Sequence, residues 1–215
     1  MAKPAPATAP LTGSLDAKLI KWGAGEIMYR VHHAAYAVDA VNPSPLGNAR
    51  FSPIRDSDGS VIPTLYAATT PQGALMETVF HDVPYKPGFK RVSIARLAGK
   101  LSSTVVFLSD FQLIDLGKIG LRRLGVHPHD LIDTTKAHYP ETRKWAESLY
   151  AAYPHAQGLI WPSRQDDRTR AVVLFGTRVR GAELRPAGLS IPLMENGVVH
   201  EVAKALATDL KVLIE

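Results

Sequence analysis

Cysteine is absent from the 215-residue sequence. Its absence excludes disulfide frameworks, zinc–cysteine sites, iron–sulfur clusters and cysteine nucleophiles, and it is compatible with a reducing cytoplasm. Long apolar runs are absent as well. The first 14 residues contain no signal-like apolar segment, and nowhere do about 18 consecutive apolar residues occur. We therefore expect a soluble, cytoplasmic protein with no membrane association.

Several motifs that mark well-known sites are also missing. The sequence has no glycine-rich phosphate loop followed by lysine, no dinucleotide fingerprint of three spaced glycines, no His-Glu-x-x-His and no Gly-x-Ser-x-Gly. Histidines occur in pairs at His32 and His33 and at His127 and His129. No third ligand is spaced to join either pair, so we expect no metal site.

The formal net charge of +5 raises the question of nucleic acid. Basic residues are interspersed with acidic ones, as in Ser163–Arg170, which is typical of solvated faces. A mild positive field would also suit a small phosphate-bearing ligand or an acidic protein partner. Because no recognition helix or cluster of basic and aromatic residues is visible, we do not expect direct nucleic-acid binding.

The composition divides the chain into a short tail and one domain. Residues 1–14 are rich in alanine and proline, with too little apolar area to offset the entropy of ordering, so we predict a flexible tail. Residues 15–215 are enough to bury a core without cross-links, and we expect a single domain. Strands that follow strands, with helices inserted irregularly, predict the α+β class.

The segment from residue 26 to residue 80 carries clear local signals. Alternation predicts a strand over Glu26–His32, and β-branched and aromatic residues predict another over residues 60–68. A helix should then begin, with Thr70 as its cap and Pro71 at its first position. Its expected buried residues are Leu75, Met76, Val79 and Phe80.

The C-terminal segment predicts a second amphipathic helix, over residues 198–214. Apolar residues recur there at helical spacing and form one stripe, which we expect to dock on the core. The residues of this stripe are Val199, Val202, Leu206, Leu210 and Leu213.

Four residues between the first strand and the first helix could form a site: Arg30, Arg50, Tyr66 and Glu77. Each also has an ordinary explanation. An arginine can be a surface or ion-paired residue, a tyrosine can be half-buried in a strand, and a glutamate can solvate the flank of a helix. Composition alone does not decide between these interpretations.

The order of motifs resembles the RES domain, a family named for an arginine, a glutamate and a serine. The resemblance runs from about Gly25 to Gly176, and it departs from the family at Ser52, where asparagine is common. The loop that follows, up to Pro63, is also longer than expected. The motifs are, in chain order, MYRVH, ARFSP, TLYAAT, ALMETVFH and GLIWPSR.

The resemblance implies a fold and an activity. RES domains have a mixed-sheet fold similar to that of ADP-ribosyltransferases, and they are toxins of bacterial Xre-RES toxin–antitoxin modules. The implied activity is consumption of NAD as a substrate, by hydrolysis or phosphorolysis of the nicotinamide–ribose bond, which depletes NAD and arrests growth. The alternative is transfer of ADP-ribose to a host protein, and a further alternative is a module that binds nucleotides or a partner without turnover. No metal is needed, because nicotinamide is already a cationic leaving group.

The resemblance also implies roles for individual residues. Glu77 would stabilise positive charge at the anomeric carbon, while Arg30 and Arg50 would bind the diphosphate of NAD. Tyr66 would stack on nicotinamide, and Arg30 and Tyr66 would belong to both the catalytic and the binding groups. Ser163 is the expected family serine and would contact ribose or phosphate. Other serines considered for this role are Ser102, Ser103 and Ser148, and Gly73 would leave room for the ligand.

Partners follow from the same resemblance. An enzyme that drains NAD must be restrained, and the implied partner is an Xre-family helix-turn-helix antitoxin that covers the mouth of the site. DNA contact would then belong to the antitoxin. We expect a homodimer or a toxin–antitoxin hetero-oligomer.

Overall fold

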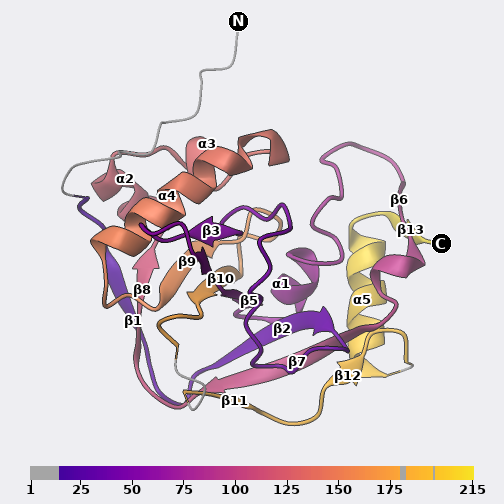
Figure 1. The fold of residues 1–215 in the computed structure, drawn as a ribbon. Helices are drawn as coiled ribbons and strands as arrows, with labels where there is room; N and C mark the ends of the chain where they lie inside the picture. Colours follow the sequence, from indigo (N-terminus) through magenta and orange to yellow (C-terminus); the bar gives the residue numbers. More distant parts are fainter. Residues whose placement is uncertain (1–14, 180–182, 196) are drawn as a thin grey trace, which may run out of the picture.

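A curled mixed sheet organises the structure, which is a computed structural model that describes residues 15–179, 183–195 and 197–215 (Figure 1). In these residues nine strands form the sheet, in the order β1-β8-β9-β10-β5-β2-β7-β11, with β12 also paired to β7. Strands β8 and β9 run parallel, and the other neighbours are antiparallel. The strands of this sheet are β1 (Leu19–Trp22), β2 (Ile27–His33), β5 (Thr64–Ala68), β7 (Lys100–Phe107), β8 (Phe111–Asp115), β9 (Gly158–Pro162), β10 (Arg170–Phe175), β11 (Leu184–Pro186) and β12 (Ile191–Pro192).

Two small strand pairs lie outside the large sheet. The first is antiparallel and joins β3 (Ile54–Arg55) to β4 (Val61–Ile62). The second is parallel and joins β6 (Lys90–Val92) to β13 (Val212–Ile214). The helices are α1 (Pro71–Met76), α2 (Lys118–Leu124), α3 (Pro128–Leu131), α4 (Tyr139–Ala152) and α5 (Val198–Asp209), with 3-10 turns η1 (Ile94–Arg96) and η2 (Lys136–His138).

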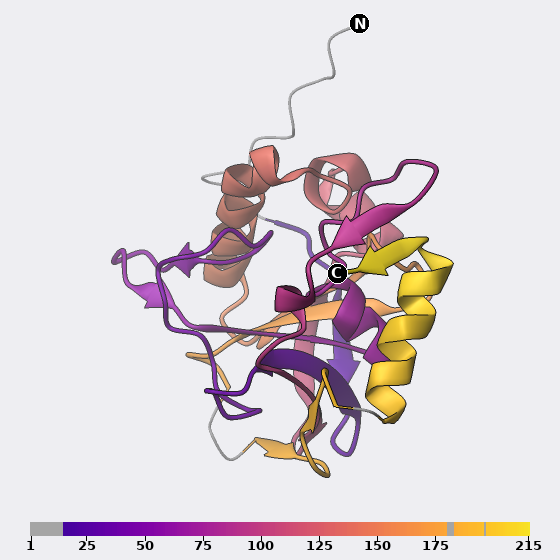
Figure 2. The same cartoon turned by 90° about the vertical axis from the view of Figure 1, so that its right-hand side faces the viewer.

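The helices form two groups around the sheet. Helices α2, α3 and α4 lie together near β8 and β9, while α1 and α5 lie side by side near β6 and β13 (Figures 1 and 2). Apolar residues of each group form a separate buried cluster, and a further cluster joins β2, β7 and β8. The structure is a single α+β domain, as the sequence predicts.

The local signals around the first helix are confirmed. Strand β2 coincides with the predicted strand, and the prediction for residues 60–68 is correct except for a break at Pro63, which separates β4 from β5. The hydroxyl of Thr70 accepts a hydrogen bond from the Gly73 N–H at 3.0 Å, so Thr70 caps α1. Pro71 occupies the start of the helix, where its missing N–H costs nothing.

Helix α1 ends earlier than the apolar spacing suggests. Its last residue is Met76, and Glu77 is the C-cap residue. The carbonyl of Leu75 accepts the N–H groups of Thr78, Val79 and Phe80, at 3.2, 2.8 and 3.1 Å, so the chain tightens into a turn. Val79 and Phe80 are still fully buried, but a turn places them rather than a helix.

The prediction of one helix through residue 214 is wrong. Helix α5 ends at Asp209, and Lys211 adopts a left-handed conformation with φ of 52° that no helix continues through. The last residues form β13 beside β6, and Leu213 is 48% exposed. The first four residues of the predicted stripe do pack on the cluster around α1.

Two other expectations concern the ends and surfaces of the chain. The predicted flexible tail, residues 1–14, lies outside the described residues. Among the residues that the structure does describe, no helix has both the length and the apolar character to cross a membrane.

Candidate active site

Glu77 and Ser163 meet through a short hydrogen bond. Strand order brings them together, because β10 lies between β5, which leads into α1, and β9, which ends just before Ser163. Ser163 Oγ donates to Glu77 Oε1 at 2.6 Å and accepts the N–H of Gln165 at 3.1 Å. Ser163 is only 3% exposed, so its hydroxyl is held in one orientation, toward the carboxylate. Glu77 Oε2 accepts no hydrogen bond from the described residues and is not sealed from solvent.

Arg50 is buried next to this pair. Its Nη1 donates to Thr134 Oγ1 at 2.9 Å and makes a longer contact of 3.5 Å to the Leu131 carbonyl. Its guanidinium carbon lies 5.3 Å from the centre of the Tyr139 ring, a cation–π contact. Burial lowers the pKa of Arg50, and the charges of nearby groups, Glu77 among them, oppose this shift.

The other donors of Arg50 are unpaired within the described part of the chain. Neither Nε nor Nη2 has a hydrogen-bond partner among the described residues, and neither is fully enclosed. These two nitrogens form one fork of the guanidinium, with the geometry that binds two oxygens of a carboxylate or phosphate.

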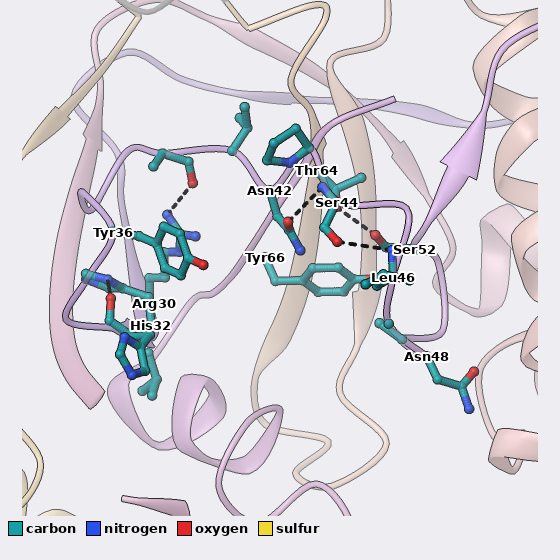
Figure 3. A pocket seen from close by; sticks show the side chains of 17 residues that line it. Arg30, His32, Tyr36, Asn42, Ser44, Leu46, Asn48, Ser52, Thr64 and Tyr66 are labelled. Atoms are coloured by element: carbon teal, nitrogen blue, oxygen red, sulfur yellow. Dashed lines mark hydrogen bonds between the residues drawn. The ribbon is translucent and has the colours of Figure 1, made fainter. Parts of the chain in front are cut away.

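Tyr66 projects from β5, beside Arg50 and Glu77. Its ring meets Trp161 edge-on at 6.2 Å, and its hydroxyl accepts the Phe51 N–H at 3.0 Å. Burial raises the pKa of Tyr66, so the phenol stays protonated and can still donate its O–H. The ring faces the pocket shown in Figure 3.

Arg30 also has a structural role that the sequence does not indicate, because part of its guanidinium binds the chain's own backbone. Its Nη1 donates to the Val38 carbonyl at 2.6 Å and to the Ala40 carbonyl at 2.9 Å. Burial lowers the pKa of Arg30 to about 10, which leaves it protonated at neutral pH. Arg30 therefore holds the loop that follows β2 against the strand, and this loop forms one wall of the pocket.

The pocket has a volume of about 470 Å³, which is within the range of small-molecule sites. Its walls come from β2, β5 and the loop between residues 34 and 52, and they include Arg30, Tyr36, Asn42, Ser52 and Tyr66 (Figure 3). Arg30 and Tyr66 also line a much smaller cavity, of about 20 Å³, that Glu77 borders. Glu77 therefore borders the small cavity and not the large pocket, and Arg30 and Tyr66 are the residues common to both.

The structure brings together most of the residues predicted from the sequence. Ser163 contacts Glu77, whereas Ser102 and Ser103 lie on β7 and Ser148 lies on α4. The expectation for Gly73 is wrong: the space beside it holds Thr169, whose Oγ1 would be 2.3 Å from a Cβ at that position. Within the described ranges, no three His, Cys, Asp or Glu side chains converge as metal ligands would.

Comparison with known families decides the identity of the fold. The family model of the RES domain matches residues 27–193. The chain belongs to the RES-domain family. Among solved structures, the RES domain described here is similar to a chain of the M. tuberculosis MbcT–MbcA toxin–antitoxin complex, with a TM-score of 0.62 and 16% identity. The match covers 90% of this chain and 91% of that chain. No curated protein sequence matches.

The RES domain also contains site residues that sequence reasoning missed. Tyr139 and Thr134 contact Arg50 from a helix start and a loop that carry no recognisable motif. Arg164 follows Ser163 directly, and its Nη1 donates to the Thr134 carbonyl at 2.6 Å. Its place in the motif that contains Ser163 could have identified it, whereas nothing in the sequence marks Tyr139.

Proposed function

We propose that this RES domain is the toxin of a toxin–antitoxin pair and that it consumes NAD by cleaving the nicotinamide–ribose bond. The observation that carries the proposal is the hydrogen bond from Ser163 to Glu77, beside the free fork of Arg50. Arg30 and Tyr66 border both the small cavity that Glu77 also lines and a neighbouring pocket of about 470 Å³, which is within the range of small-molecule sites. A fixed carboxylate and an anion-binding guanidinium are the two groups that this reaction needs most.

Glu77 is the proposed catalytic residue. When the glycosidic bond breaks, its electron pair leaves with nicotinamide, and positive charge develops at the anomeric carbon of the ribose. A carboxylate already held in place stabilises that charge more in the transition state than in the ground state. Ser163 fixes one oxygen of Glu77, so Oε2 is the atom that would face the sugar or a ribose hydroxyl.

Arg50 is the proposed anchor of the diphosphate. Its Nε and Nη2 offer a bidentate contact that lysine cannot reproduce. Arg30 uses Nη1 for the loop, so its direct contact with NAD would come from its other nitrogens. Tyr66 offers its ring to nicotinamide and its O–H to the ribose or the amide.

The proposed partner is an antitoxin. The similar solved structure is a toxin–antitoxin complex, and this supports an antitoxin for the present chain too. We propose that it is an Xre-family helix-turn-helix protein that covers the pocket and carries the DNA contacts. A homodimer or a hetero-oligomer with that antitoxin is the proposed assembly.

The products of the reaction test the proposal. The purified chain is incubated with NAD, with and without inorganic phosphate and with and without a bacterial lysate. Free ADP-ribose identifies hydrolysis, and its 1-phosphate identifies phosphorolysis. A labelled protein band with negligible free product identifies ADP-ribosyl transfer instead. If NAD is not consumed at any enzyme concentration, the chain is a binding module and the proposal is wrong.

A further inference from the structure

A hydrogen-bonded chain runs from Asp82 through His81 to Tyr139, behind Arg50. His81 Nδ1 lies 3.0 Å from Asp82 Oδ1, and His81 Nε2 lies 3.2 Å from the Tyr139 hydroxyl. An ionised carboxylate can only accept, so Nδ1 carries a proton. In neutral His81, Nε2 then accepts the O–H of Tyr139, and this fixes the tautomer of the ring.

The Asp82 end of this chain is firmly anchored. Arg96 Nη2 and Lys136 Nζ each lie 2.9 Å from the Asp82 carboxylate, and they come from η1 and η2. Burial acts to raise the pKa of Asp82, but hydrogen bonds from Lys136, His81 and Arg96 outweigh it and hold the pKa well below its usual range. Asp82 therefore stays ionised and gives His81 a fixed partner.

The Tyr139 end of the chain supports Arg50. Tyr139 is 1% exposed, and its ring faces the Arg50 guanidinium. On another side of the guanidinium, the Thr134 hydroxyl accepts a hydrogen bond from Arg50 Nη1. The Tyr139 ring and the Thr134 hydroxyl together restrict the guanidinium to one position, so a displaced Tyr139 would displace the unpaired Nε and Nη2.

His81 also connects the two segments that carry Glu77 and Ser163. It lies four residues after Glu77, in the turn closed by the hydrogen bond from the Val83 N–H to the Phe80 carbonyl. Its carbonyl accepts Gln165 Nε2 at 2.6 Å, and Gln165 lies two residues after Ser163. The ring and the backbone of this one histidine therefore link the segments that carry Glu77 and Ser163 to Tyr139, which faces Arg50.

We propose that His81 and Tyr139 are positioning residues that set the place of Arg50 relative to Glu77. They act on NAD through Arg50 and not by touching it, and this inference rests on the proposed function. Because Arg50 would hold the diphosphate equally in the ground state and the transition state, a loosened Arg50 weakens NAD binding more than it slows the chemical step.

Three substitutions separate positioning from simple packing. Tyr139→Phe keeps the ring and removes only the hydroxyl. His81→Gln places an amide where Nε2 lies and can still accept from Tyr139, whereas His81→Asn reaches only the Nδ1 position, toward Asp82. The control is Tyr150→Phe, which removes a hydroxyl that contacts Thr177 on another part of the molecule.

The expected result is a split between KM and kcat. Tyr139→Phe and His81→Asn should raise the KM for NAD about tenfold, the usual effect of one lost hydrogen bond, with kcat within about threefold of the parent. His81→Gln and Tyr150→Phe should match the parent. Unchanged KM in Tyr139→Phe and His81→Asn, or an equal loss in His81→Gln and His81→Asn, would overturn the inference.

A second measurement separates this inference from the proposed function. ADP-ribose binding to the same variants is followed by calorimetry, which requires no turnover. If the parent does not cleave NAD, the proposed function fails, yet about tenfold weaker ADP-ribose binding in Tyr139→Phe and His81→Asn supports positioning. Equal ADP-ribose affinities in the parent and these two variants, or no ADP-ribose binding by the parent, would overturn the positioning inference.

Discussion

Thr169 fills the space that a side chain at Gly73 would need. A Cβ at Gly73 would lie 2.3 Å from Thr169 Oγ1 and 2.8 Å from its Cγ2. The same Thr169 hydroxyl lies 3.1 Å from Thr69 Oγ1 and 3.0 Å from Thr70 Oγ1, so it connects the start of α1 to β10. Glu77 is one turn farther along, and its backbone N–H donates to the Gly73 carbonyl at 2.9 Å.

The first prediction follows from this contact. Gly73→Ala should destabilise the protein by about 1–3 kcal/mol, because overpacking against a short side chain outweighs the better helix propensity of alanine. Urea unfolding monitored by fluorescence measures the difference in unfolding free energy between the parent and Gly73→Ala. Adding Thr169→Ser to the Gly73→Ala protein removes Cγ2, and this double variant should recover part of the lost unfolding free energy. A stable Gly73→Ala protein would mean that the two segments separate easily.

A second prediction concerns Ser163. Ser163→Ala removes the donor that orients the Glu77 carboxylate, so kcat/KM for NAD should fall by about tenfold to a hundredfold, the range for hydrogen bonds to charged groups. Ser93→Ala is the control, because the Ser93 hydroxyl also contacts a backbone N–H but lies at the start of η1. Equal kinetics in Ser163→Ala and the parent would show that Glu77 needs no support from Ser163.

A third prediction separates charge from geometry at Arg50. Arg50→Lys keeps the positive charge but loses the fork, so the KM for NAD should rise by about tenfold or more. The matched control is Arg55→Lys, since among the described residues the Arg55 guanidinium donates only to the exposed Gly59 carbonyl. Steady-state kinetics measure both. An unchanged KM in Arg50→Lys would exclude bidentate binding of the diphosphate.

A fourth prediction concerns acid stability. The pKa of Asp82 is lowered in the folded protein, so its contribution to stability is present above its unfolded pKa of about 4 and is lost as pH falls below it. Asp82→Asn cannot titrate. The gap in unfolding free energy between parent and variant should therefore be constant from pH 7 to about pH 5 and should shrink below about pH 4. A gap independent of pH would show that the ionised carboxylate adds nothing.

The sequence predicts the beginning of α1 but not its end. Thr70 and Pro71 are local signals, and both act as expected. The end depends on the Leu75 carbonyl, which accepts three N–H groups once the chain turns, and no spacing of apolar residues reveals that. Likewise, β13 forms because β6 lies beside it, and this pairing joins residues far apart in the sequence.

In the candidate site, too, the sequence reveals some features, and others depend on tertiary contacts. The order of motifs points to Glu77, Arg50 and Ser163 as candidates, because each lies in a short motif that carries the resemblance to the RES domain. The hydrogen bonds of Arg30 to its own loop and the ring of Tyr139 beneath Arg50 depend on tertiary contacts. The sequence could therefore identify the candidate site residues but not the residues that hold them in place.

The turnover of NAD by Glu77→Gln tests the central claim most directly. The substitution keeps the shape of the side chain and its contact with Ser163 but removes the negative charge that would stabilise the sugar cation. The control is Glu141→Gln, which removes a carboxylate that, within the ranges the structure describes, is ion-paired only with Lys144 on α4. We expect the parent and Glu141→Gln to consume NAD at the same rate and Glu77→Gln to be at least about a hundredfold slower. Equal rates in all three proteins would contradict the account.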